Sequence, residues 1–212
     1  AAGWDEHAEA AGRQFRMKHP GWWDTVIGPG KAIDTRKFFV ICSNFLGSCY
    51  GTTGPSSINP RTGKPYALSF PVVTVSDWVK VQAILLDKLG IERVHCVIGG
   101  SLGGQQALEW ALAYPQRVDR AIVFAAAHRL STQGVAFNAV GRQVIMTDAN
   151  FNQGNYYESE HHKNGLAVAR MMAHITYLSE AGMHQKFGRR LRLENGSPSA
   201  LGGEFEVESY LD

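Results

Sequence analysis

The sequence lacks the features that would place it in a membrane or on a nucleic acid. No apolar run approaches the roughly 20 residues of a membrane span, and the opening stretch AAGWDEHAEAAGRQF has no charged-then-apolar signal pattern. The 21 basic and 19 acidic residues give a formal net charge of +2 and form no basic cluster. We therefore expect a cytoplasmic protein without a membrane or nucleic-acid partner.

Cysteine is scarce as well. The three cysteines, Cys42, Cys49 and Cys96, are an odd number and include no C-x-x-C pair, which argues against a disulfide framework or a zinc site. We expect reduced thiols, as is usual in the cytoplasm, and no bound metal or cofactor. Nothing in the sequence around Cys49 would activate its thiol, so we expect this thiol to be buried and not a nucleophile.

The apolar residues that are present alternate between strand and helix patterns. With 212 residues and 44% hydrophobic content, the chain can form one sizeable core. Strands are predicted at Phe38–Cys42, at Val94–Ile98 and within 118–127, and helices at 74–90 and from Leu102 to Pro115. For the first helix we expect Ser76 as the N-cap and Gly90 as the stop. The alternation predicts an α/β fold, a parallel sheet with helices on both faces.

Two parts of the chain depart from this alternation. A loop rich in glycine, serine and proline covers 46–71, and a loop of that length is usually functional or disordered. Beyond His128 the segments 132–148 and 164–182 are both helical, with no strand between them. We therefore divide the chain into a core at 1–128, a helical cap insertion at 129–190 and an unassigned tail at 191–212.

The segment VIGGSLGGQQALEWALAYP carries the strongest chemical signal. Gly99, Ser101 and Gly103 form G-x-S-x-G between a predicted strand and a predicted helix, which is the context of a nucleophile elbow. Glycines there let strand and helix approach closely. The backbone N–H of Leu102 is then expected to donate to the oxyanion that forms when Ser101 attacks an acyl group.

With its buried strand, elbow and helical insertion, the chain resembles the α/β-hydrolase superfamily. Four stretches between Gly21 and about Phe187 are similar to the homoserine O-acetyltransferase family: GWWDTVIGPGKAIDTRKFFVICSN, LGSCYGTTGPSSINP, GGSLGGQQALEWA and ARMMAHITYLSE. The resemblance implies transfer of an acetyl group from acetyl-CoA to L-homoserine through an acyl-serine at Ser101, in methionine biosynthesis. It also implies a homodimer and places the loop 46–71 beside the active site.

Arg170 and Tyr177 match the family's substrate-binding arginine and tyrosine. They lie seven residues apart, so two helical turns place them on one face. A guanidinium can bind the carboxylate of homoserine through two parallel charge-assisted hydrogen bonds. The alternative is a solvated arginine on the surface of the cap.

A serine nucleophile also needs a base and an acid, and the chain provides no match to either. In this fold the acid and the histidine follow the serine on later loops, and none of the eight histidines occupies the family's catalytic position. We expect the catalytic Asp and His, and a second oxyanion donor, to lie outside this chain, whose fold is then incomplete at both ends. His128 is the best local alternative as a base. An ester hydrolase, a transferase specific for succinyl-CoA or serine, and a catalytically silent fragment also remain open.

Overall fold

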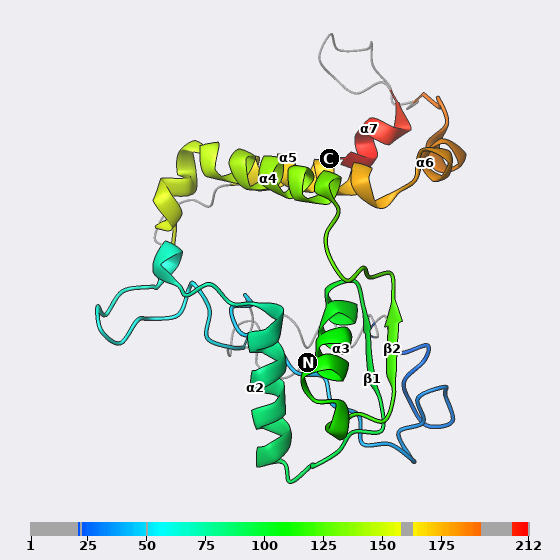
Figure 1. The fold of residues 1–212 in the computed structure, drawn as a ribbon. Coiled ribbons are helices and arrows are strands. Elements are labelled where there is room, and N and C mark those ends of the chain that lie inside the picture. Colours follow the sequence, from blue (N-terminus) through cyan, green and yellow to red (C-terminus); the bar gives the residue numbers. More distant parts are fainter. Residues whose placement is uncertain (1–20, 22, 50, 158–162, 192–204, 212) are drawn as a thin grey trace. The chain divides into compact units, whose positions relative to one another are not determined.

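The structure is a computed structural model that describes residues 21, 23–49, 51–157, 163–191 and 205–211. The chain divides into two compact units, Ala1–His128 and Arg129–Asp212. Each unit has its own secondary structure (Figure 1). The first is an α/β unit and the second is helical, so we describe them separately.

The first unit is built on two parallel strands with a helix between them. Strand β1 (Val97–Gly100) pairs with β2 (Ala121–Phe124) in a register that aligns Val97 with Ala121 and Gly100 with Phe124. Helix α3 (Leu102–Ala113) connects them and packs on both strands, and helix α2 (Val75–Lys88) packs beside α3 (Figure 1). A short 3-10 turn, η2 (Pro115–Arg117), follows α3 where proline ends it.

The core of this unit lies between α2, α3 and one face of the strands. Val79, Ala83 and Leu86 of α2 meet Trp110 of α3, and partly buried apolar residues including Val97 pack against them. The opposite face of the strand pair carries Ile98, Ile122 and Phe124, which are 40–49% exposed. Trp23 contacts this face, with its ring centroid 5.9 Å from that of Phe124.

The N-cap of helix α2 lies two residues before the predicted one. Thr74, not Ser76, is the N-cap: its side chain accepts from the N–H of Asp77, whose carboxylate accepts in return from the N–H of Thr74. The prediction of Ser76 was wrong because a capping box needs an acidic residue three positions after the cap, and Asp77 meets that requirement for Thr74. Gly90 follows the C-cap with a φ of +70°, a conformation that favours glycine, as predicted.

The strands differ more from the prediction. The strand predicted at Val94–Ile98 is confirmed only in its last two residues: Val94 forms an isolated bridge, and β1 begins at Val97 and continues to Gly100. The strand predicted within 118–127 is confirmed as β2. The predicted strand Phe38–Cys42 is irregular, and Phe39 is 78% exposed. A strand needs a neighbour for its backbone groups, and the described residues offer no segment paired with 38–42. Residues 38–42 therefore form no β-sheet hydrogen bonds with another described segment.

The loop 46–71 is irregular as predicted, apart from a 3-10 turn, η1 (Ala67–Ser69), and an isolated bridge between Ile58 and Pro65. Its start is fixed on α2: the indole N–H of Trp78 donates to the carbonyl of Leu46 at 2.8 Å, and Phe45 stacks on the Trp78 ring. Cys49 in this loop is exposed and reduced, so the expectation of a buried thiol was wrong. Its neighbours in this open loop do not cover it.

The second unit is helical in the residues that the structure describes. Helix α4 (Thr132–Thr147), the turn η3 (Ala149–Gly154) and helix α5 (Lys163–Tyr177) form a hairpin, and α6 (Glu180–Phe187) and α7 (Glu206–Leu211) follow. The helices predicted at 132–148 and 164–182 are confirmed, the latter with a break before Glu180. Within the unassigned tail, Tyr210 of α7 packs on His174 and Phe187. No described helix is long and apolar enough to cross a membrane.

Candidate active site

Ser101 occupies the sharp turn between β1 and α3. Its backbone has a φ of 53° and a ψ of −120°, a conformation that side-chain-bearing residues rarely adopt. The turn is held by hydrogen bonds on both sides: the N–H of Ser101 donates to the carbonyl of Phe124 at 3.1 Å, and its carbonyl accepts from Gly104 and Gln105. This strained strand-to-helix geometry is that of a nucleophile elbow.

Three glycines around the turn are required by close backbone approach. A Cβ on Gly99 would lie 2.1 Å from the carbonyl oxygen of Gly103, and one on Gly100 would meet the Phe124 ring at 2.3 Å. A Cβ on Gly104 would lie 2.5 Å from that of Ala126. The second glycine of the motif, Gly103, has nothing within 4 Å of its Cβ position. The expected close approach is therefore confirmed at Gly99 and was wrong for Gly103. Gly104, which lies outside the motif, is the glycine that lets α3 approach the end of β2.

The hydroxyl of Ser101 is available for chemistry. Ser101 is exposed and is the N-cap of α3, yet its side chain makes no capping hydrogen bond, and within the described parts of the chain no group binds its Oγ. The N–H of Leu102 lies in the first turn of α3, where backbone donors have no partner within the helix. The positive end of the helix dipole adds to this donor. The arrangement can therefore hold an acyl oxyanion beside Ser101.

A chain of side-chain amides lies directly behind this turn. Gln106 is 4% exposed, and its amide donates to the carbonyl of Leu102 while accepting from Gln82 of α2. Gln82 accepts in turn from the indole N–H of Trp110. None of these residues was predicted from the sequence as part of the site. The available signal was a glutamine four residues after Leu102, on the buried side of a helix where an apolar residue is usual.

The other predicted site residues lie elsewhere. Arg170 and Tyr177 are both on α5 in the second unit, and both are exposed, Tyr177 at 82%. Neither has an ion pair or hydrogen bond with any described residue. His128 is exposed, four residues beyond the end of β2, and no described group contacts its ring. The structure thus brings Ser101 and Leu102 together, and Arg170 and Tyr177 belong to a different unit.

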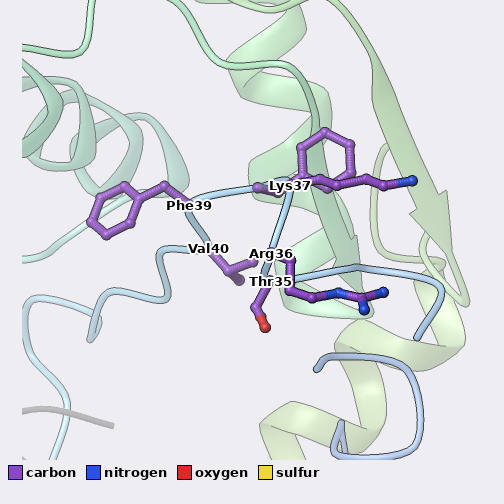
Figure 2. Close-up of a pocket in the computed structure, with 6 residues that line it drawn as sticks. Thr35, Arg36, Lys37, Phe39 and Val40 are labelled. Atoms are coloured by element: carbon purple, nitrogen blue, oxygen red, sulfur yellow. The ribbon is translucent and has the colours of Figure 1, made fainter. Parts of the chain in front are cut away.

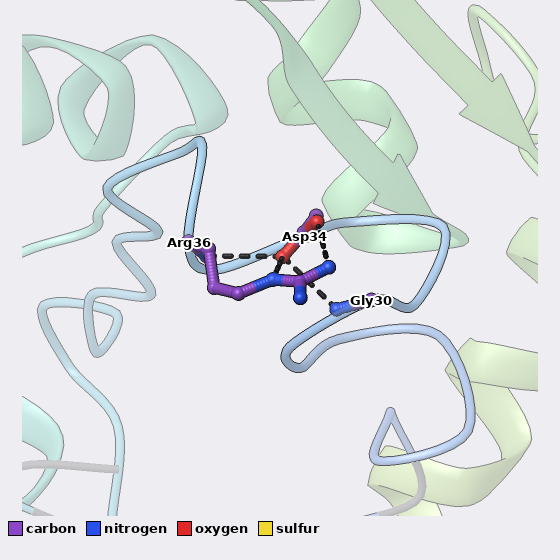
Figure 3. A network of polar contacts seen from close by, with 3 residues as sticks. All are labelled: Gly30, Asp34 and Arg36. Atoms are coloured by element: carbon purple, nitrogen blue, oxygen red, sulfur yellow. Dashed lines mark hydrogen bonds and ion pairs between the residues drawn. The ribbon is translucent and has the colours of Figure 1, made fainter.

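Two further features of the first unit are separate from the elbow. Figure 2 shows an open hollow lined by Thr35, Arg36, Lys37, Phe38, Phe39 and Val40, none of which is a candidate site residue. In Figure 3 the buried carboxylate of Asp34 accepts from the guanidinium and N–H of Arg36 and from the N–H of Gly30. The Arg36 hydrogen bond, followed by the backbone donors, lowers the pKa of Asp34 to about 2. This network fixes a turn.

Comparison with known proteins agrees with the geometry. Residues 18–210 match the family described as the alpha/beta hydrolase fold. The chain is 58% identical over 206 residues to a homoserine O-succinyltransferase of Halorhodospira halophila, covering 97% of this chain and 54% of that protein. It is 56% identical over 204 residues to a homoserine O-acetyltransferase of Methanohalobium evestigatum, covering 96% and 42%. The chain therefore spans about half the length of the curated relatives it matches.

Solved structures show the same fold. A crystal structure of homoserine O-acetyltransferase from Bacillus anthracis superposes with a TM-score of 0.81 at 34% identity, over 92% of this chain and 53% of that one. A crystal structure of esterase E22 gives 0.78 at 38% identity, over 91% and 54%. The fold class predicted from the sequence is confirmed. With an elbow at Ser101, a parallel strand pair and a family match over most of its length, the chain belongs to the alpha/beta hydrolase fold family, and its relatives there include homoserine O-acyltransferases.

Proposed function

We propose that the full-length protein carrying this chain transfers an acetyl group from acetyl-CoA to the hydroxyl of L-homoserine through an acyl-enzyme at Ser101. The observation that carries the proposal is the strained turn at Ser101, with a free Oγ beside the free N–H of Leu102. The similarity to homoserine O-acyltransferases over nearly the whole chain supports this choice of substrates.

The proposed reaction has two halves. In the first, Ser101 Oγ loses its proton to a base and attacks the thioester carbonyl carbon, and the C–S bond breaks as coenzyme A leaves and takes up a proton. In the second, the homoserine hydroxyl attacks the acyl-serine and releases O-acetylhomoserine, with Ser101 recovering its proton. The N–H of Leu102 donates to the oxyanion in both halves.

The remaining roles rest on the resemblance. We assign Arg170 to the acceptor carboxylate and Tyr177 to the same substrate, with segment 129–190 as a cap. The base and its orienting acid are assigned to parts of the protein outside this chain. Within the described residues no histidine or carboxylate contacts Ser101 Oγ, which supports that assignment. A homodimer and a place in methionine biosynthesis complete the proposal.

The acyl donor is the least constrained part of the proposal. Relatives named for acetyl transfer and for succinyl transfer match this chain at similar identity, 56% and 58% in the two cases above. We propose acetyl-CoA because the stretch GTTGP in the loop 46–71 resembles the acetyl-transferring members. Succinyl-CoA is the competing donor, and the test below includes it.

The test is to trap the acyl-enzyme. Full-length protein is mixed with acetyl-CoA or succinyl-CoA without an acceptor, digested and analysed by mass spectrometry. We expect acetyl on the peptide containing Ser101, no adduct with Ser101→Ala, and little succinyl adduct. Label on another residue would contradict the role of Ser101, and preferential succinyl labelling would contradict the donor.

Ester hydrolysis is a second candidate function, favoured by the similarity to esterase E22. A hydrolase would form the same acyl-enzyme but pass the acetyl group to water. Adding homoserine to the acyl-enzyme distinguishes the two functions. A transferase loses the adduct much faster with homoserine than without it, whereas a hydrolase loses it at the same rate in both cases.

A further inference from the structure

Helix α2 contacts both the start of the loop 46–71 and the helix that begins at the reacting serine. Trp78 holds the start of the loop 46–71 through Leu46, and one helical turn later Gln82 binds the amide of Gln106 on α3. Residues four positions apart lie on the same side of a helix. One face of α2 therefore holds the glycine-rich loop and the helix that begins at the nucleophile.

The hydrogen bonds from α2 to the elbow form a continuous, oriented chain. The indole N–H of Trp110 donates to Gln82 Oε1 at 2.7 Å, Gln82 Nε2 donates to Gln106 Oε1 at 2.7 Å, and Gln106 Nε2 donates to the carbonyl of Leu102 at 3.4 Å. Each amide donates at one end and accepts at the other. Gln106 and Trp110 are buried and Gln82 is half-buried. A largely buried polar chain satisfied in this way fixes the position of its members more strictly than apolar packing does.

The end of this chain is at the reacting turn. Leu102 bears the proposed oxyanion donor and directly follows Ser101, whose φ of 53° must be maintained against its own preference. Small displacements of reacting groups have large kinetic costs. A buried amide on Gln106 is also costly unless it is paired. Its position behind the elbow therefore indicates a function that an apolar residue would not provide.

We propose that Trp110, Gln82 and Gln106 are positioning residues that hold the first turn of α3, and with it Ser101 and the N–H of Leu102, in the geometry that acylation needs. The inference rests on the proposed function only in that Ser101 is taken to be acylated. It requires neither coenzyme A nor homoserine, so it can be tested with a simple activated ester.

The test compares variants of the full-length protein in the burst of nitrophenolate from p-nitrophenyl acetate. Gln82→Met keeps an unbranched side chain of similar length but removes both ends of the amide link. We expect its acylation rate constant to fall about tenfold while the KM for the ester stays within about twofold of wild type. Gln106→Met should show the same fall in the acylation rate constant. The double variant should be no slower than either single variant, because each single substitution already interrupts the same hydrogen-bonded chain.

The matched control is Val79→Ala, which removes fully buried packing around Trp110 but deletes no hydrogen bond of the amide chain. Its melting temperature should fall while its acylation rate constant stays near wild type at a temperature where it is folded. An unchanged rate in both glutamine variants, losses that multiply in the double variant, or an equal rate loss in Val79→Ala would each overturn the proposal. If wild type gave a burst but no transfer to homoserine, the proposed function would be contradicted. The acylation rates of the variants would still decide whether the glutamines position Ser101.

Discussion

Ser101 holds a backbone conformation that costs a serine about 1–3 kcal/mol. The surrounding residues impose it: Ser101 bonds to the carbonyl of Phe124, and α3 begins immediately after it. This detail could be predicted from the sequence because the spacing Gly-x-Ser-x-Gly has one structural meaning between a strand and a helix. The glutamine chain could not, because its pairing depends on how α2 and α3 pack.

The two glycines of the motif should respond in opposite ways to alanine. In Gly99→Ala the new Cβ would lie 2.1 Å from a backbone oxygen, so the elbow must shift. We expect a loss of about 2–3 kcal/mol in the free energy of unfolding and a large fall in Ser101 acylation. Gly103→Ala, the control, meets nothing within 4 Å and sits in a helix, so it should be neutral or gain up to about 1 kcal/mol. Denaturant unfolding measures both, and equal losses would contradict the geometry.

Asp34 should make stability depend on pH in the acid range. Its folded pKa, about 2, lies below the ordinary value near 4. The folded state therefore binds fewer protons than the unfolded state between these values. The stabilisation is complete above about pH 4 and is lost as the pH falls toward 2.

The control for this prediction is Asp34→Asn, which removes the titrating group. The stability difference between wild type and variant, from denaturant unfolding at pH 2–6, should shrink below pH 4. A difference that stays constant across this range would show that the carboxylate charge has no such effect.

At the scale of elements, helices were predicted with closer bounds than strands: β2 lies within the predicted 118–127, but β1 is shifted from 94–98 and the segment 38–42 forms no strand. Local periodicity, caps and stop residues predict the helices at 75–88, 132–147 and 163–177. A strand depends on a partner elsewhere in the chain: β1 pairs with β2 through Gly99 and Gly100, residues of low strand propensity, whereas the aromatic run at 38–42 has no described partner. The cap at Thr74 was missed because Thr74 and Ser76 both have a hydroxyl that can cap a helix, and they lie two positions apart.

The hairpin of α4 and α5 depends on one close crossing. A Cβ on Gly165 would lie 2.8 Å from the carbonyl of Val144 and 3.0 Å from the Cα of Ile145, both backbone atoms. The N–H of Gly165 also donates to the carboxylate of Asp148 at 2.6 Å. We expect Gly165→Ala to force the helices apart and to destabilise the second unit by about 1–3 kcal/mol.

Gly141 of α4 provides the matched control for that crossing. Its Cβ would meet only the end of the flexible Met172 side chain, at 3.4 Å, so Gly141→Ala should be neutral or stabilise by up to about 1 kcal/mol through helix propensity. Thermal unfolding followed by circular dichroism compares the two variants. A loss in Gly141→Ala as large as in Gly165→Ala would mean that glycine is needed for another reason than the crossing.

At the scale of the whole molecule, the two units correspond to the two halves of the proposed reaction. Ser101, proposed to carry the acyl group, and Leu102, proposed to donate to the oxyanion, are in the first unit, and Arg170 and Tyr177, assigned to the acceptor, are in the second. The sequence could indicate both sets by motif and resemblance. It could not identify a base, because proton transfer needs side chains brought together by the fold and no local spacing encodes them.

This division predicts that Arg170 and Ser101 affect different steps. In the full-length protein, Arg170→Ala should raise the KM for homoserine by roughly 30- to 150-fold, equivalent to a charge-assisted pair worth about 2–3 kcal/mol. Acylation of Ser101 in a rapid-quench experiment should stay near the wild-type rate, because the donor half does not use the acceptor carboxylate. Arg142→Ala, the loss of another exposed arginine in the same unit, controls for net charge and should change neither value. If Arg170→Ala slowed acylation as much as transfer, or left the KM for homoserine unchanged, the guanidinium would not be the acceptor's carboxylate site.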